Sequence, residues 1–240
     1  MIAIVYTENE EESLAIYNKI KEYKIDNTEF VKVDDLIRCK LENKYELAIF
    51  LSPHKSSKGV SSFTVHACGN WSNDNSYGGL PDKLSMAKPD LMLSMLKRMK
   101  ENNKRSNINV TYEATHHGPY SDTPIIFAEF MDKDIDYCSS VVAKSIYEAL
   151  SSNESYNKIA VGIGSTHYPI RFTKLALEKS YAFSHIMPKY HINADMLSDA
   201  FERSDPKAEI AVIEKSSLNS SQFRSIIDTL NRLGYDYEIY

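Results

Sequence analysis

The stretch Leu47-Ala48-Ile49-Phe50-Leu51-Ser52-Pro53-His54 has the pattern that decides the fold: an apolar run that stops at turn-forming and polar residues. A short apolar run bounded by turn residues is typical of a strand buried in a sheet. The same pattern returns along the whole chain. We therefore predict strands at residues 2–6, 30–33, 47–51, 63–67, 109–114, 159–163, 209–213 and 235–239.

Helical segments lie between several of these strands. Apolar side chains recur at steps of three and four residues in 14–20, 92–99 and 223–233, which is the spacing of one helix face. Pro89 stands where a proline opens a helix, and Gly234 follows the third segment as a helix-ending glycine does. The alternation predicts an α/β fold with a mostly parallel or mixed central sheet flanked by helices, because parallel connections need crossover helices.

The composition describes one globular chain of 240 residues, of which 42% are hydrophobic and 25% charged. No linker-like tract and no repeat divides it, so we expect residues 1–240 to form a single compact domain. No apolar run is long enough to cross a membrane, and the first residues lack the basic flank of a secretory leader. The three cysteines have no paired spacing and fit a reducing compartment. We therefore predict a cytoplasmic protein.

Glycine and histidine are scarce and are concentrated in the same part of the chain. Seven of the 8 glycines and five of the 7 histidines lie between residues 54 and 167. Glycine permits positive φ angles and close approach of the backbone to a ligand. The predicted loop 69–87 lies in the same region and is long enough to be functional. We expect the chemistry of the protein to lie there.

Three histidine-bearing segments each follow a predicted strand. They are Ser52-Pro53-His54-Lys55-Ser56-Ser57, Glu113-Ala114-Thr115-His116-His117-Gly118-Pro119 and Gly162-Ile163-Gly164-Ser165-Thr166-His167-Tyr168-Pro169. Because α/β sheets place ligand crevices at the carboxyl ends of strands, we expect the three segments to converge on one crevice. His66 lies inside a predicted strand, and we expect it to be structural.

Imidazole groups close to carboxylates suit zinc, which binds neutral nitrogen and oxygen donors and keeps one position for water in catalytic sites. The candidate ligands are His54, His116, His117 and His167, and the nearby carboxylates are Glu113 and Asp122. The chain has no H-E-x-x-H or C-x-x-C signature. Spacing therefore leaves open a metal site and a metal-free site in which a histidine acts as general base.

The net charge of −5 argues against a protein coated in nucleic acid but allows a local basic patch. Lys97, Arg98 and Lys100 lie at the end of the second predicted helix. Two interpretations stay open: a solvated helix end whose cations complement the dipole, and a contact with phosphates. The chain has no P-loop, dinucleotide fingerprint or nucleophile elbow, which disfavours the enzyme classes that use them.

The ordered set of motifs resembles one known family. It comprises Ser52-x-His54, Thr64-Val65-His66, Gly69-Asn70-Trp71, Tyr77-Gly78-Gly79, the string Glu113 to Pro119, Gly162-Ile163-Gly164 with His167-Tyr168, and Lys189-Tyr190-His191. Motifs in this order occur in the D-aminoacyl-tRNA deacylases of the archaeal and plant type. The match covers most of the chain.

The resemblance implies hydrolysis of the ester between a D-amino acid and the 3′ end of tRNA. It also implies a fold similar to the phosphorylase/hydrolase-like group and zinc as cofactor, with up to two ions per chain. The partner is then D-aminoacyl-tRNA, and the protein is a monomer or homodimer without a stable protein partner. The implied catalytic residues are His54, His116, His117, His167, Glu113 and Thr115, with the four histidines as metal ligands. The implied substrate contacts are Ser52, Asn70, Gly118, Gly164, Tyr168, Lys97, Arg98 and Lys100.

Two other functions stay open on the sequence. One is a different metal-dependent hydrolase on the same fold, acting on small esters, peptides or nucleosides. The other is a tRNA-binding module without catalysis. Comparable activity on free amino-acid esters would favour the first, and tRNA affinity without turnover would favour the second.

Overall fold

The computed structural model describes residues 1–42, 44–55, 59–152 and 154–240. Its larger sheet has six strands in the order β2-β1-β3-β8-β4-β7. They are β1 (Ile2–Tyr6), β2 (Thr28–Lys32), β3 (Leu47–Pro53), β4 (Ser62–His66), β7 (Asn109–Tyr112) and β8 (Ile125–Met131). Every neighbouring pair is parallel except β4 with β8, so β4 and β7 run against the other strands.

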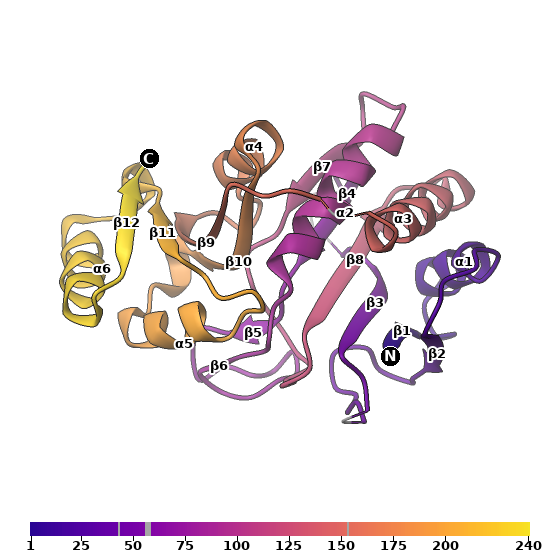
Figure 1. Cartoon of the computed structure of the whole chain (residues 1–240), viewed down its shortest axis with the longest axis horizontal. Coiled ribbons are helices and arrows are strands. Elements are labelled where there is room, and N and C mark those ends of the chain that lie inside the picture. Colours follow the sequence, from indigo (N-terminus) through magenta and orange to yellow (C-terminus); the bar gives the residue numbers. More distant parts are fainter. Residues whose placement is uncertain (43, 56–58, 153) are drawn as a thin grey trace.

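A second sheet of order β10-β9-β11-β12 is parallel throughout and lies toward the other end of the molecule (Figure 1). Its strands are β9 (Lys158–Ser165), β10 (Tyr181–Pro188), β11 (Ile210–Ile213) and β12 (Asp236–Ile239). A small antiparallel pair joins β5 (Gly69–Asn70) to β6 (Lys83–Leu84).

The helices connect the strands and cover the sheets. They are α1 (Glu11–Ile20), α2 (Pro89–Asn102), α3 (Ile135–Leu150), α4 (Ile170–Lys179), α5 (Leu197–Glu202) and α6 (Ser220–Leu233), with short 3-10 helices η1 (Lys189–His191), η2 (Ala194–Met196) and η3 (Lys215–Ser217). Helices α1, α2 and α3 pack on one face of the six-stranded sheet, along its upper side in Figure 1. Helices α5 and α6 pack on the second sheet.

The two faces of the six-stranded sheet differ because side chains alternate along each strand. On β3, Ile49 and Leu51 join the core beneath the helices. Phe50 points to the opposite face, which is continued toward the strand end by Ser52 and His54. This second face therefore changes from apolar to polar along β3 and carries the functional side chains described below.

Residues 113–117 join the two sheets. The N–H of Glu113 donates to the carbonyl of Val65 in β4 (3.2 Å). The N–H of Thr115 donates to the carbonyl of Ile186 in β10 (2.9 Å). The segment is thus held on both sides by backbone hydrogen bonds, and the side chains that it carries have fixed positions.

The prediction of an α/β fold with a mixed sheet flanked by helices is confirmed, and the strands are divided between two sheets. Every predicted strand is present, with ends that differ by a few residues. The sequence pattern missed β8, β10, α3, α4 and α5, and the predicted loop 69–87 contains β5 and β6. The single domain stays a prediction, although one buried core runs from Ile4 in β1 to Val212 in β11.

Two helix boundaries have the predicted chemistry. Pro89 occupies the first turn of α2, where no backbone donor is needed, and Gly234 ends α6 with a φ of 76°. Among the described residues, no helix combines the length and the apolar character needed to cross a membrane.

Candidate active site

A cavity of about 780 Å³ opens over the polar part of the six-stranded sheet, on the face opposite α1, α2 and α3. The predicted site residues that line it are Ser52, His54, Asn70, Glu113, Thr115, His116, His117 and His167. The three histidine-bearing segments therefore converge, as predicted. They meet above a sheet face and not at one carboxyl edge, because β4 runs opposite to β3 and β8.

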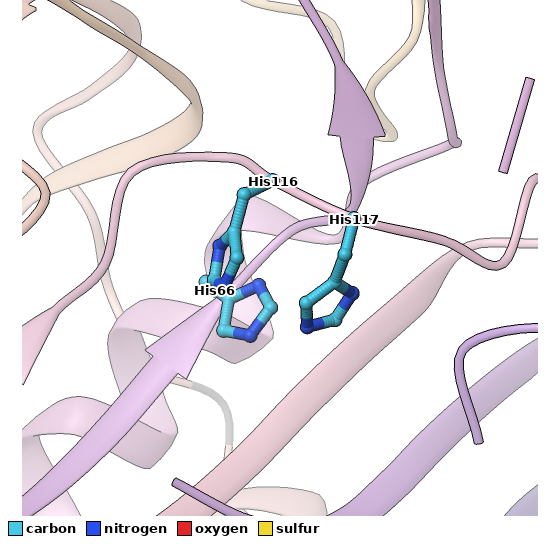
Figure 2. A group of neighbouring side chains, drawn as sticks. All are labelled: His66, His116 and His117. Atoms are coloured by element: carbon cyan, nitrogen blue, oxygen red, sulfur yellow. The ribbon is translucent and has the colours of Figure 1, made fainter. Parts of the chain in front are cut away.

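Three imidazole rings lie together at the cavity (Figure 2): His116 and His117 line it, and His66 is buried beside them. The ring centroids of His66 and His116 lie 4.3 Å apart, as do those of His116 and His117. One ligand atom from each of the three rings lies within 4.8 Å of the corresponding atoms of the other two. His66, expected to be structural, thus belongs to this histidine cluster.

Backbone carbonyls fix the tautomers of these rings. The Nδ1 atoms of His66, His116 and His117 lie 3.1, 2.8 and 2.6 Å from the carbonyl oxygens of Ala67, Ala114 and Gly118. A carbonyl only accepts, so each Nδ1 carries a proton, and a neutral ring leaves its Nε2 lone pair free. Burial lowers the pKa of His66, but Cys68 and Glu129, whose Oε1 is 3.5 Å from Nε2, raise it well above its usual range. A cation at Nε2 of His66 would therefore displace a proton. Metal-binding histidines are typically held in this way by a donor bond from the second nitrogen.

Burial favours the neutral form of two of these rings. Burial, together with the charge of neighbouring histidines, holds the pKa of His116 well below its usual range and lowers that of His117 to about 4. Neutral imidazoles are the form that binds zinc. At neutral pH both rings can therefore offer Nε2 to a cation.

Glu113 lies completely buried between the histidines. Its Oε1 is 3.0 Å from Nδ1 of His54, and its Oε2 is 2.7 Å from Nε2 of His167 and 3.8 Å from Nε2 of His116. Burial alone would raise the pKa of Glu113, but His167 and His54 hold it well below its usual range. The carboxylate is therefore ionised.

Several donor atoms in the cavity have no well-oriented hydrogen bond from a described residue. They are both carboxylate oxygens of Glu113 and Nε2 of His66. A buried ionised group without directed partners is costly, and coordination of a cation removes this cost. Three imidazole nitrogens with a carboxylate are also a donor set that zinc prefers. The residues of the cavity therefore fit a metal ion.

His54 differs from the other histidines. Its Nδ1 is 3.3 Å from Oε2 of Glu129, and its Nε2 is 2.7 Å from the hydroxyl of Tyr168. Burial would lower the pKa of His54, but Glu113 and Glu129 raise it to about 11. Both nitrogens already have partners, so the geometry favours a protonated ring over a metal ligand. The predicted role of His54 as a ligand stays a prediction.

Three predicted residues line the cavity with their polar groups already bonded inside the protein. The hydroxyl of Thr115 accepts the N–H of Ile186 (3.0 Å) and lies 3.4 Å from Nδ1 of His185. The amide of Asn70 donates to the carbonyls of Gly78 and Leu80. The hydroxyl of Ser52 donates to the carbonyl of Pro53 (3.2 Å). Thr115 and Asn70 hold the walls of the cavity in place.

The two glycines predicted to bind substrate serve close packing of the backbone. A Cβ on Gly118 would lie 2.1 Å from the nitrogen of Gly79 and 2.5 Å from the carbonyl oxygen of Ile37. The N–H of Gly118 already donates to the carbonyl of Tyr77 (3.1 Å). Gly164 has a φ of +93°, and a Cβ there would contact Ser217. Neither glycine lines the cavity.

The structure does not bring the predicted basic residues to the cavity. They lie in α2 near the amino ends of β9 and β10, whereas His167 follows the carboxyl end of β9. The Nζ of Lys97 pairs with Glu154 at 2.7 Å, and Arg98 pairs with Glu101 and Glu154. Lys100 is exposed on the same helix. The three residues do not line the cavity, and their contact with phosphates stays a prediction.

The structure does not place Asp122, predicted near the histidines, at the cavity. Asp122 pairs with Arg203 at 2.7 Å. Ser56 and Ser57 lie outside the described residues.

The sequence pattern missed Glu129, the second buried carboxylate. It sits in β8, directly opposite Thr64 of β4, and faces His54 and His66. One signal was available: Glu129 is the only charged residue in the apolar run Ile125 to Met131. A charge inside a buried strand needs a partner, and here the partners are histidines.

Comparison with known proteins agrees with this arrangement. The family model described as D-aminoacyl-tRNA deacylase matches residues 41–238. The chain belongs to the D-aminoacyl-tRNA deacylase family. The match spans the cavity residues from Ser52 to His191. It leaves out residues 1–40, where the loop between β1 and α1 supplies Thr7, Asn9 and Glu10 to the wall.

Members of the family in archaea are similar over most of the chain. The D-aminoacyl-tRNA deacylase of Ignicoccus hospitalis is 39% identical over 194 residues, which cover 78% of this chain and 78% of that protein. The D-aminoacyl-tRNA deacylase of Methanosarcina barkeri is 34% identical over 95% of this chain and 77% of its own length. The crystal structure of AF0625, a conserved protein of unknown function, superposes with a TM-score of 0.89 at 25% identity, covering 100% of this chain and 95% of that one.

Proposed function

We propose that this protein hydrolyses the ester bond of D-aminoacyl-tRNA and releases the free D-amino acid and tRNA. The observation that carries the proposal is the convergence of five histidines and two carboxylates at one cavity of a deacylase-family chain: His54, His66, His116, His117, His167, Glu113 and Glu129. Ester hydrolysis needs an activated water and a group that protonates the leaving oxygen. The cavity holds candidates for both tasks.

A zinc ion would be held by Nε2 of His66, His116 and His117, whose Nδ1 atoms are already bonded to the backbone. Bound zinc supplies a water of lowered pKa and polarises the ester carbonyl. A second ion would use Glu113 and His167 and would replace their ion pair. We propose the ion at the histidine cluster, and metal analysis of the purified protein counts the ions.

His167 is placed to transfer the proton. Its Nε2 is held at 2.7 Å by the buried carboxylate of Glu113, while a third of its side chain is exposed to the cavity (32%). This matches the arrangement of a general base oriented by a carboxylate. We assign to His167 the uptake of a proton from the attacking water and its delivery to the 3′-oxygen of the leaving ribose.

His54 serves a different purpose. Its protonated ring sits between Glu113 and Glu129, with Tyr168 at the other nitrogen. It balances the charge of two ionised carboxylates that would otherwise repel each other in a buried place. Glu113 is thereby held in position for His167.

The proposal is tested with D-aminoacyl-tRNA and L-aminoacyl-tRNA as parallel substrates. Glu113→Gln is expected to lower kcat for the D substrate by at least 100-fold, because the amide no longer orients His167 as a base. Asp122→Asn is the matched control, since it makes the same chemical change at an 80% exposed side chain and should leave kcat unchanged.

Three outcomes would contradict the proposal. Equal hydrolysis of free D-amino-acid esters and charged tRNA would indicate a small-ester hydrolase. Affinity for tRNA without turnover would indicate a binding module. Equal turnover of the D and L substrates would remove the chiral selectivity that the family name requires.

We also propose a cytoplasmic location, where charged tRNA is found. The thiols of Cys39, Cys68 and Cys138 are all free, as expected in a reducing compartment. A monomer or homodimer without a stable protein partner remains our expectation, and light scattering of the purified protein would test it.

A further inference from the structure

The mouth of the cavity has two sides of different charge. The side formed by the loops after β1, β2 and β5 carries Glu10, Asp34, Asp35 and Asp74. Lys55 neutralises Glu10 at 2.8 Å, and Arg38 neutralises Asp35 at 3.1 Å. Asp34 and Asp74 have no ion-pair partner among the described residues. This side would repel a phosphate backbone.

The opposite side is formed by the carboxyl end of the second sheet. His167 follows β9 and lines the cavity, and Tyr190 places its hydroxyl 3.3 Å from Nδ1 of His167. Lys189 precedes Tyr190 in η1, and its carbonyl accepts the side-chain amide of Gln222 in the first turn of α6. The surface thus runs without interruption from the catalytic histidine to α6.

Three exposed cations lie on this surface: Arg171, Lys189 and Lys215. Arg171, at the start of α4, donates to the hydroxyl of Ser216 in η3 (3.1 Å), next to Lys215. In the same place, Glu214 is mostly buried, with 17% of its side chain exposed. Burial raises the pKa of Glu214, although Arg171 and Lys189 act against this shift. Arg171 is paired with Glu214 at 3.5 Å, so the net positive charge of the surface comes from Lys189 and Lys215.

An exposed aromatic ring completes the surface. Tyr190 is 55% exposed, its hydroxyl lies 3.3 Å from Nδ1 of His167, and its ring centroid lies 5.0 Å from that of His191. An exposed ring beside cations is the arrangement on which proteins stack unpaired bases of single-stranded nucleic acids. The ring lies at the edge of the cavity, where the ester has to enter.

We propose that Tyr190, Arg171, Lys189 and Lys215, named here the η1 surface, bind the single-stranded 3′ end of tRNA. Tyr190 stacks the terminal base, and the three cations contact the phosphates of the nucleotides before it. The inference rests on the proposed function, because it supposes that the ester reaches His167. It gives the tRNA a path different from α2, where the sequence placed the basic contacts.

The test measures the affinity for uncharged tRNA, which does not depend on hydrolysis, at several salt concentrations. In the double variant Lys189→Ala/Lys215→Ala, the slope of log affinity against log salt should fall by about 1.4, since each single-strand phosphate contact contributes about 0.7. The KM for D-aminoacyl-tRNA should rise, on the order of 10-fold, at a similar kcat. The control Lys21→Ala/Lys24→Ala removes the same charge from exposed residues just after α1 and should change neither quantity, whereas Lys100→Ala/Lys104→Ala tests the alternative path along α2.

Tyr190 is tested by two substitutions. Tyr190→Ala should weaken tRNA affinity by about 5- to 100-fold, the range found when a stacking aromatic is removed. Tyr190→Phe keeps the ring and should bind within about two-fold of the parent. Loss of affinity in both variants would assign the effect to the hydroxyl and overturn the stacking role.

The two proposals fail in different ways. The η1 surface would be overturned if Lys189→Ala/Lys215→Ala kept the wild-type salt slope and tRNA affinity while Lys100→Ala/Lys104→Ala lost tRNA affinity. Hydrolysis of D-aminoacyl-tRNA would persist in that case. Loss of affinity in the η1 variants of a protein that never hydrolyses D-aminoacyl-tRNA would support the surface and overturn the proposed function.

Discussion

Gly118→Ala is expected to force apart three loops whose backbones pack closely together beside the histidine cluster. The added Cβ would lie 2.1, 2.5 and 2.6 Å from the nitrogen of Gly79, the carbonyl oxygen of Ile37 and the carbonyl carbon of Gly78. All three are backbone atoms, so no side chain can turn away. The loops would have to separate by roughly 1 Å to reach an ordinary contact of 3.4 Å. Overpacking of this kind costs about 3 kcal/mol.

The function should suffer with the fold, because His117 precedes Gly118 and bonds to its carbonyl at 2.6 Å. We expect the affinity for zinc to fall about 10-fold, the lower end of what loss of a supporting contact costs. Urea unfolding of the metal-free protein measures the stability, and titration with zinc measures the affinity.

The matched control is Gly234→Ala. Gly234 has a positive φ of 76° but no atom within 4 Å of an added Cβ, so only the backbone strain of about 1 kcal/mol is expected. Full stability and activity in Gly118→Ala would refute the packing argument.

Three further predictions follow from the buried groups of the site. His116→Ala should lower kcat by at least 100-fold and reduce the zinc content, because it removes one Nε2 from the histidine cluster; unchanged metal content would place the ion elsewhere. Glu129→Gln should lower the free energy of unfolding by about 3–5 kcal/mol, since His54 and His66 lose a buried carboxylate partner, and urea unfolding checks this. Burial lowers the pKa of His185 to about 4, so the unfolded chain takes up its proton first as pH falls below about 6.5. The free energy of unfolding should therefore fall by up to about 1.4 kcal/mol per pH unit as the pH drops from about 6.5 to about 4. Urea unfolding at a series of pH values measures this slope, and His185→Asn should flatten it. An unchanged slope in the variant would assign the pH dependence to other groups.

The strands and helices that the sequence revealed are those with a regular apolar pattern. Residues 47–51 and 223–233 have such a pattern and form β3 and α6. Strand β8 was missed because Glu129 interrupts its apolar run, and the same residue is one of the two carboxylates of the site. Local pattern cannot show the reversal of β4 and β7, because it depends on pairing between residues far apart in the chain.

Only part of the site was predicted, because local sequence patterns show some of its residues and long-range contacts bring in the others. Histidines next to glycines indicated His116, His117 and His167. His66 looked like a strand residue, and only the neighbouring strand β8 and the segment 113–117 bring it into the cluster. The basic residues of α2 formed a clear run in the sequence, but helix position relative to the sheet decides which cations reach the cavity.

The segment 113–117 makes the two sheets dependent on each other. Glu113 is bonded to the backbone of β4, and Thr115 is bonded to β10. Neither half of the chain can therefore assemble the cavity alone: a fragment ending near residue 155 would keep His66, His116 and His117 but lose His167. Two inactive fragments cut there would regain hydrolysis only on reassociation, so activity itself reports the docking of one sheet on the other.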